Sequence, residues 1–179
     1  ETNATDLTLW NNGKGNIVSN TSFGDGALKI NSTGTNNTAY GYNALDANTT
    51  GASNTAIGAN ALGSNTTSQN NTAVGNRALQ FNTAANNTAV GYLSLDANTT
   101  GANNTAIGRS ALAANTTGAS NTAIGYGALD ANTTAASNTA VGDTAAGANT
   151  TGTRNTVVGH EALRHNTTGS DNVALGKDA

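Results

Sequence analysis

A five-residue motif, Asn-Thr-Ala-(Ile/Val)-Gly, returns along this chain every 17 residues, with a single 16-residue step. Six copies match the motif and four more are variants of it. The copies begin at Asn20, Asn37, Asn54, Asn71, Asn87, Asn104, Asn121, Asn138, Asn155 and Asn172. A unit this short cannot bury an apolar face alone, so chains of this kind fold by stacking one unit on the next. The repeat therefore predicts a solenoid.

Each unit, numbered from its first Asn, keeps one residue type at several positions. Positions 1 and 12 are Asn, position 4 is large and apolar, position 5 is Gly, and position 9 is Leu except at Ala146. These positions form the structural repeat, which includes Ile57, Val74, Val90, Ile107 and Ile124 at position 4, Leu62, Leu79, Leu95, Leu112 and Leu129 at position 9, Gly58, Gly75, Gly91, Gly108 and Gly125 at position 5, and Asn48, Asn65, Asn98 and Asn115 at position 12.

The unit that begins at Asn54 illustrates the local structure that we expect. Residues 55–57 are β-branched or small and predict a short strand, which Gly58 ends with a backbone conformation that other residues resist. Residues 61–62 predict a second short strand, and residues 65–67 have the Asn-Thr-Thr composition of a turn. One unit is then one coil of an all-β, parallel β-solenoid, with like residues stacked at about 4.8 Å and Asn ladders along the rod.

The predicted solenoid spans residues 20–179, with nine full coils and a partial tenth. Residues 1–19 form a lead segment that we expect to cap the first coil, since residues 7–10 alternate like a strand and hold the only Trp. The last coil stops at position 8. An open solenoid end is a template for pairing, so we expect it to continue into more chain or to associate end to end with another subunit.

The predicted core is thin, because positions 4 and 9 supply about two large apolar side chains per coil. Burying an aliphatic side chain contributes roughly 1.5–3 kcal/mol, whereas ordering each residue costs about 1–2 kcal/mol. A single stack therefore needs more buried surface. We expect oligomerisation through the small side chains at positions 3 and 8, for example Ala56 and Ala61.

Charge and composition exclude several functions. Only 9% of the residues are charged, the net charge is −3 and Cys is absent. Too few Lys and Arg are present to neutralise nucleic-acid phosphates, and no apolar run is long enough to insert into a membrane. No nucleophile–base pair or phosphate loop is recognisable, which indicates a non-enzymatic protein without a cofactor. His160 and His165 could form a metal-binding ring around a three-fold axis, but a solvated charge cluster fits their variable positions better, and we assign no metal site.

Charged residues of the repeat region fall only at positions 6, 7, 10 and 17, as expected of a solvated face beside a buried one. Three units combine Tyr at position 6 with Asp at position 10. These pairs, a candidate surface for a sugar or protein ligand, are Tyr42/Asp46, Tyr92/Asp96 and Tyr126/Asp130. The alternative interpretation is duplication of one ancestral unit, with Tyr covering the edge of the roll.

The repeat resembles the head repeat of YadA-like trimeric autotransporter adhesins, whose motif reads Asn-Ser-Val-Ala-Ile-Gly-x-x-Ser. Residues 55–58 match Val-Ala-Ile-Gly with Thr in place of Val, and Ser94 restores the final Ser once. The resemblance covers about residues 20–179 and implies a left-handed parallel β-roll, three chains wide, on a cell surface. Similar repeats occur in phage tail fibres. The 17-residue period is longer than the usual coil of the family, which implies a longer corner.

These observations predict a non-catalytic, extracellular fibre or adhesin head segment, on a cell surface or a virion, that projects and mediates attachment. Its partners would be further copies of itself, in a homotrimer or end to end, and a host surface glycan or matrix protein. The first alternative is a self-assembling filament, glycosylated at Asn-x-Thr/Ser sequons such as Asn48 and Asn65. The second is an ice-binding solenoid, suggested by the Thr rows at positions 2, 13 and 14, for example Thr55, Thr66 and Thr67.

Overall fold

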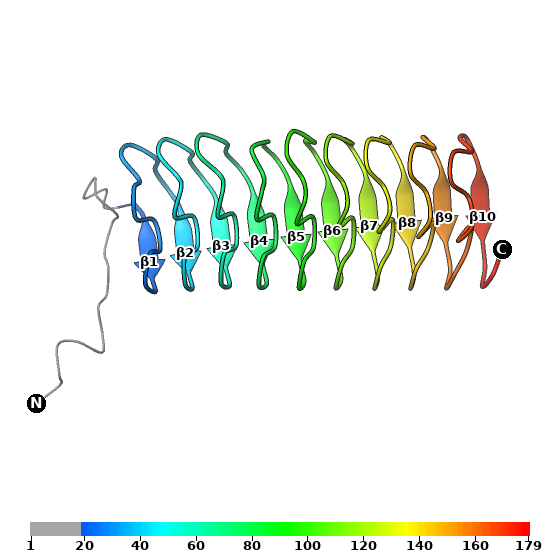
Figure 1. The fold of residues 1–179 in the computed structure, drawn as a ribbon, viewed down its shortest axis with the longest axis horizontal. Coiled ribbons are helices and arrows are strands. Elements are labelled where there is room, and N and C mark those ends of the chain that lie inside the picture. The colour runs from blue at the N-terminus through cyan, green and yellow to red at the C-terminus, as the bar shows by residue number, and fades with distance from the viewer. Residues whose placement is uncertain (1–18) are drawn as a thin grey trace, which may run out of the picture.

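The computed structural model describes residues 19–179, which form one row of stacked coils with no helix (Figure 1). The capping role predicted for residues 1–19 therefore falls almost wholly outside the described part. Each coil contributes one three-residue strand, and the ten strands form a single parallel sheet in sequence order. The strands are β1 (Thr21–Phe23), β2 (Thr38–Tyr40), β3 (Thr55–Ile57), β4 (Thr72–Val74), β5 (Thr88–Val90), β6 (Thr105–Ile107), β7 (Thr122–Ile124), β8 (Thr139–Val141), β9 (Thr156–Val158) and β10 (Val173–Leu175). The predicted parallel β-solenoid with 17-residue coils is confirmed.

Like residues stack directly along the sheet, as the repeat predicts. Thr55 pairs with Thr72, and Thr72 pairs with Thr88 across the 16-residue unit, so the register survives the missing residue. The shortening lies in the corner. Asn65 donates its side-chain amide to the carbonyl of Ser68, three residues on, whereas Asn82 reaches the carbonyl of Ala84, only two residues on.

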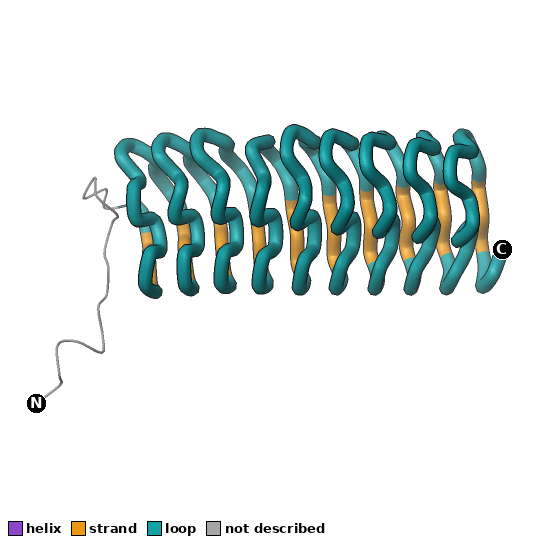
Figure 2. The backbone as a smooth tube through the Cα atoms, viewed as in Figure 1, coloured by secondary structure: helices purple, strands orange, loops and turns teal. Residues whose placement is uncertain are grey.

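The second predicted strand is wrong, because residues 61–62 and their equivalents lie in tight turns (Figure 2). Asn60 and Leu62 both have a left-handed backbone, with φ of 57° and 52°. Two such residues separated by one curl the chain instead of extending it. The Leu62 amide still donates to the carbonyl of Ala78 in the next coil at 3.1 Å. Full burial of the Leu62 side chain offsets the cost of about 1–2 kcal/mol for this backbone.

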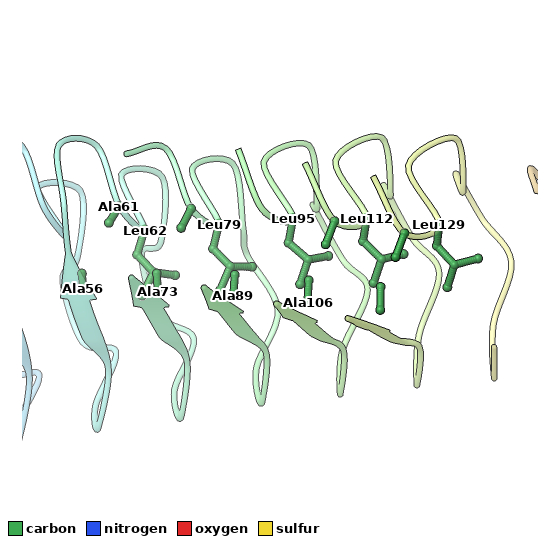
Figure 3. Packing of buried hydrophobic residues seen from close by; sticks show 14 of the residues in the cluster. Ala56, Ala61, Leu62, Ala73, Leu79, Ala89, Leu95, Ala106, Leu112 and Leu129 are labelled. Atoms are coloured by element: carbon green, nitrogen blue, oxygen red, sulfur yellow. The ribbon is translucent and has the colours of Figure 1, made fainter. Parts of the chain in front are cut away.

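The core consists of the Leu at position 9 and the Ala at positions 3 and 8, which point into the coil (Figure 3). Side chains alternate along a strand, so an inward Ala56 places Thr55 and Ile57 on the outside. Ile57 is 40% exposed. The prediction that position 4 belongs to the core is therefore wrong. The predicted use of Ala56 and Ala61 for oligomer contacts is also wrong, because both are fully buried within their own chain.

The predicted Asn ladders are present and line the interior. Asn115 donates from Nδ2 to the side-chain oxygen of Asn98 at 2.8 Å and to the carbonyl of Gly118 at 3.0 Å. Asn104, at position 1, donates to the same carbonyl at 2.8 Å, and its backbone amide donates to the side-chain oxygen of Asn87. The two ladders thus fasten each corner to its own coil and to the coil before it.

The Gly at position 5 ends each strand in a conformation closed to other residues. Gly108 has φ of 134°, and a Cβ atom there would collide with the carbonyl of Gly125 in the next coil. The same collision recurs from coil to coil. Gly is therefore required for the backbone angle and for the close approach of successive coils.

Candidate functional site

Two outer surfaces of the rod differ in character. The first, which we call the outer sheet face, consists of the residues at positions 2 and 4 of the strands. It carries no charged residue from β1 to β10. Thr at position 2 is mostly half-buried, and the apolar residue at position 4 is half-buried or exposed. At one end of this face the rings of Phe23 and Tyr40 stack with centroids 4.9 Å apart. The face therefore presents an uncharged row of hydroxyl and methyl groups beside an apolar row.

The second surface, which we call the variable edge, consists of positions 6, 7, 10 and 11. It holds the three predicted Tyr/Asp pairs, and the side chains of Tyr42, Tyr92 and Tyr126 are about half exposed. Residue types here change from coil to coil, unlike those of the interior. The variable edge is thus the part of the rod whose chemistry differs along its length.

The three Asp residues of these pairs have different surroundings. Asp96 forms an ion pair with Arg77 at 2.9 Å. The carboxylate of Asp46 accepts hydrogen bonds from the backbone amides of Asp46 and Ala47, and the positive charge of Lys29 stabilises its ionised form. Within the described part of the chain, Asp130 forms no ion pair and no side-chain hydrogen bond.

Burial raises the pKa of all three carboxyl groups. For Asp96 the charge of Arg77 and its hydrogen bond oppose that rise, and for Asp46 the backbone amides and Lys29 oppose it. For Asp130 burial acts unopposed. Asp130 is therefore the one of the three carboxylates that no cation or backbone amide of the described coils contacts, whereas Asp96 pairs through Oδ2 and keeps a buried Oδ1 without a partner.

A shallow, open groove of about 440 Å³ brings Tyr126 and Asp130 together with Thr144 from the next coil and Arg164 and His165 from the coil after that. This volume is in the range of small-molecule sites. Gly127 and Gly147 also line the groove and keep it open, because most other coils carry side chains at these positions. Sequence reasoning found Tyr126 and Asp130 but missed the groove, whose signal was the coincidence of glycines at positions 7 and 10 of adjacent coils.

Two features of the groove are unusual for a surface turn. The hydroxyl oxygen of Thr144 is buried and has no hydrogen-bond partner. Thr144 also has φ of 49°, a left-handed conformation that is an outlier for a β-branched residue. On the other side of Tyr126, the guanidinium carbon of Arg109 lies 5.4 Å from the ring centroid. This cation–π contact restricts the orientation of the ring.

The two histidines lie apart. His165 lines the groove, whereas His160 approaches Glu161 and Asp178, with ligand atoms within 4.8 Å of one another. The spacing of 17 residues between Glu161 and Asp178 carried this signal. Glu161 already forms an ion pair with Arg164 at 2.5 Å. This cluster is at the solvent-exposed end of the described coils, and we assign no metal to it.

The Thr rows occupy three different environments. Position 2 belongs to the outer sheet face. At position 13 the hydroxyl mostly donates to the backbone of the next coil, as from Thr49 to the carbonyl of Thr66 at 3.0 Å. Position 14 is exposed in the corner, as at Thr67. The sequon residues Asn48 and Asn65 are fully buried in the ladder, which leaves no room for a glycan in the folded rod.

No protein-family model, curated protein or solved structure matches this chain. Among the described coils, no helix has the length and hydrophobicity needed to cross a bilayer. Interpretation of the site therefore depends on the geometry of the chain itself.

Proposed function

We propose that this chain is a non-catalytic, surface-exposed fibre or adhesin head segment, extracellular or on a virion, that projects and mediates attachment. The supporting observation is the contrast between a uniform interior and a variable edge. The Asn ladders and the Leu row repeat from coil to coil and produce a straight support, about 4.8 Å per coil. Most of the side chains that differ between coils lie on the variable edge, where a host glycan or matrix protein would reach them.

The outer sheet face is the surface through which we propose that three chains associate. It is uncharged along ten consecutive strands and carries a continuous row of partly exposed apolar side chains at position 4, and contiguous apolar surface often marks an interaction site. Most coils also bury only one large apolar side chain, the Leu at position 9, together with two Ala, and the coil with Ala146 buries none. Covering Ile57 and its equivalents would add the buried surface that this lean core lacks.

Molar mass in solution, measured by light scattering on a size-exclusion column, tests this function. We expect a mass near three times 17.6 kDa, stable over a range of concentration. The triple variant Ile57→Glu, Ile107→Glu, Ile124→Glu should reduce it to the monomer mass. The matched control, Thr67→Glu, Thr100→Glu, Thr117→Glu, adds the same charge at exposed position 14 and should leave the mass unchanged. Large, concentration-dependent species would indicate the end-to-end filament instead, and a wild-type monomer would overturn both assemblies.

Ice binding is the second candidate, because Thr at position 2 and Ile or Val at position 4 face outward in register on β3 to β8. Regular rows of hydroxyl and methyl groups can order water in a repeating pattern. Ice binding requires the outer sheet face to be exposed to solvent, so it is incompatible with burial of that face in a trimer. Thermal hysteresis that is abolished by Thr105→Lys would support ice binding, and its absence in the wild-type chain would remove it.

A further inference from the structure

We infer that the groove beside Tyr126 is a binding site for a neutral saccharide, with Tyr126 as the stacking platform and Asp130 as the hydrogen-bonding group. This inference deepens the proposed attachment function, on which it rests, by naming the ligand class and the place where it binds. It assigns one such site to each chain, although the sequence has three Tyr/Asp pairs.

The shape of the groove suits a flat ring. Gly127 and Gly147 remove side chains on the side of Tyr126 that faces the following coils, while Arg109 comes from the preceding coil and contacts the Tyr126 ring. A ring held in one orientation loses little freedom on binding, which favours affinity. Sugars present C–H groups on one face and hydroxyl groups around the rim, and an aromatic ring beside polar groups matches both.

The Asp130 carboxylate accepts no hydrogen bond within the described chain. The Asp130 side chain is exposed, so a ligand can reach it, and it forms no ion pair with another described residue. Hydrogen bonds to charged groups are stronger than neutral ones, so a ligand hydroxyl that reaches this carboxylate is favoured. A sugar hydroxyl can donate to the Asp130 carboxylate, which is an acceptor only.

The charges of the groove favour a neutral ligand over an acidic one. Arg164 is the only cationic guanidinium in the lining, and Glu161 already neutralises it in an ion pair. Asp130 then leaves an uncompensated negative charge, which would repel a carboxylate, sulfate or phosphate. The groove therefore fits a neutral pyranose better than a sialic acid or a sulfated sugar.

The other two Tyr/Asp pairs lack this combination. Beside Tyr92, Arg77 pairs with Oδ2 of Asp96, and Oδ1 is buried, where a ligand cannot reach it. Beside Tyr42, backbone amides hold Asp46 and the charge of Lys29 reaches it. These pairs have the same residue types at the same spacing, so they provide matched internal controls for the site at Tyr126.

Saturation-transfer NMR on the full chain tests the inference, with the methyl glycosides of D-glucose, D-galactose and D-mannose as probes and sialic acid and glucose 6-sulfate as acidic competitors. We expect at least one neutral glycoside to bind. Tyr126→Ala and Asp130→Asn should each weaken that binding by roughly tenfold or more, whereas Tyr92→Ala and Asp96→Asn should not change it. The acidic sugars should not displace the glycoside.

Three results would overturn the inference: no binding of any neutral glycoside, equal weakening by the Tyr92 and Tyr126 variants, or tighter binding of the acidic sugars. The molar mass of the same samples separates this failure from failure of the proposed function. A trimeric wild-type chain that binds no glycoside would remove the saccharide site and leave the fibre assembly standing. A monomer that binds a glycoside through Tyr126 would support the saccharide site and remove the fibre assembly.

Discussion

The interior of the rod and its variable edge are built by the same coils, yet they follow opposite rules. In the interior each residue contacts its own copy one coil away, as Asn115 contacts Asn98 and Asn132. At the variable edge the neighbours of a position differ from coil to coil. Asp96 forms an ion pair with Arg77, whereas Asp130 forms none within the described coils. Repetition therefore determines the fold, and the departures from repetition determine where a ligand could bind.

This comparison predicts how sensitive each region is to substitution. An interior residue serves the coil before it and the coil after it, so its loss damages two interfaces. A residue of the variable edge faces solvent on one side, so fewer contacts with other residues depend on it. Effects on the free energy of unfolding should therefore fall from the backbone glycines, through the Asn ladders, to the ion pairs and single carboxylates of the edge.

The largest effect should come from Gly108→Ala. The added Cβ would meet the carbonyl of Gly125, and φ of 134° is closed to Ala. We expect a loss of about 3 kcal/mol or more in the free energy of unfolding, measured by urea denaturation. The matched control is Gly63→Ala at position 10, where the nearest atom would be 3.4 Å away. That control should be neutral or slightly stabilising, and an equal loss in both variants would contradict the proposed role of position 5.

The next largest effect should come from Asn115→Ala in the ladder. This change removes the hydrogen bonds to Asn98, Gly118 and Asn132. It leaves buried polar groups unsatisfied on both sides, and each such group costs about 1–3 kcal/mol. We expect a total loss of about 3 kcal/mol in urea denaturation. Asn76→Ala, at an exposed position 6, should change stability by less than about 0.5 kcal/mol. A similar loss in both would show that the ladder adds little.

Much of the interior could be predicted from the sequence, because repetition multiplies weak local signals. One Gly58 or one Asn65 is uninformative, but the same residue at the same position in successive units indicates a required conformation or a ladder. The direction of Ile57 could not be predicted by its size. Large apolar residues are usually buried, but in a three-residue strand the inward Ala56 forces its neighbours outward. The strand period, applied strictly, would have placed Ile57 correctly.

The prediction of a second strand at residues 61–62 was wrong for a related reason. Leu62 beside Ala61 has the composition of a strand, and neither residue type predicts a left-handed backbone at Leu62. Asn60 before it was the available signal, since Asn tolerates φ above zero. The groove at Tyr126 lay beyond the sequence because it requires residues from several coils to be compared at once, including Gly127 and Thr144.

The ion pair between Arg77 and Asp96 should have a smaller effect than any ladder residue, because solvent screens it. Arg77→Met should reduce the free energy of unfolding by about 0.5 kcal/mol. Arg77 lowers the pKa of Asp96 against the effect of burial, so the variant should raise that pKa further, as measured by NMR titration of the carboxyl carbon. The more exposed pair of Arg154 and Asp171 is the control. Arg154→Met should let the lowered pKa of Asp171 return toward its ordinary value, and a fall in the pKa of Asp96 would contradict the assignment.

The smallest effect should come from Asp130→Asn, and its sign is opposite to the others. Burial raises the pKa of Asp130 above its unfolded value, so this group contributes stability below the ordinary Asp pKa of about 3.9 and loses it as pH rises through the folded pKa. At neutral pH the ionised carboxylate destabilises the folded state. Asp130→Asn should therefore raise the free energy of unfolding by about 0.5 kcal/mol or less, since water still screens the group. Urea denaturation at pH 7 and at pH 3 should show this gain disappearing in acid.

Asp171→Asn supplies a control of opposite sign for that measurement. Arg154 lowers the pKa of Asp171, so its stabilising effect is present at neutral pH and is lost as pH falls through the folded pKa. The Asp171 variant should therefore lose stability at pH 7 and match the wild type in acid. If Asp130→Asn instead destabilises the rod at pH 7, the carboxylate has a structural partner and is not held for a ligand. A variant that gains stability while losing glycoside binding would mark Asp130 as a residue kept for recognition at a cost to the fold.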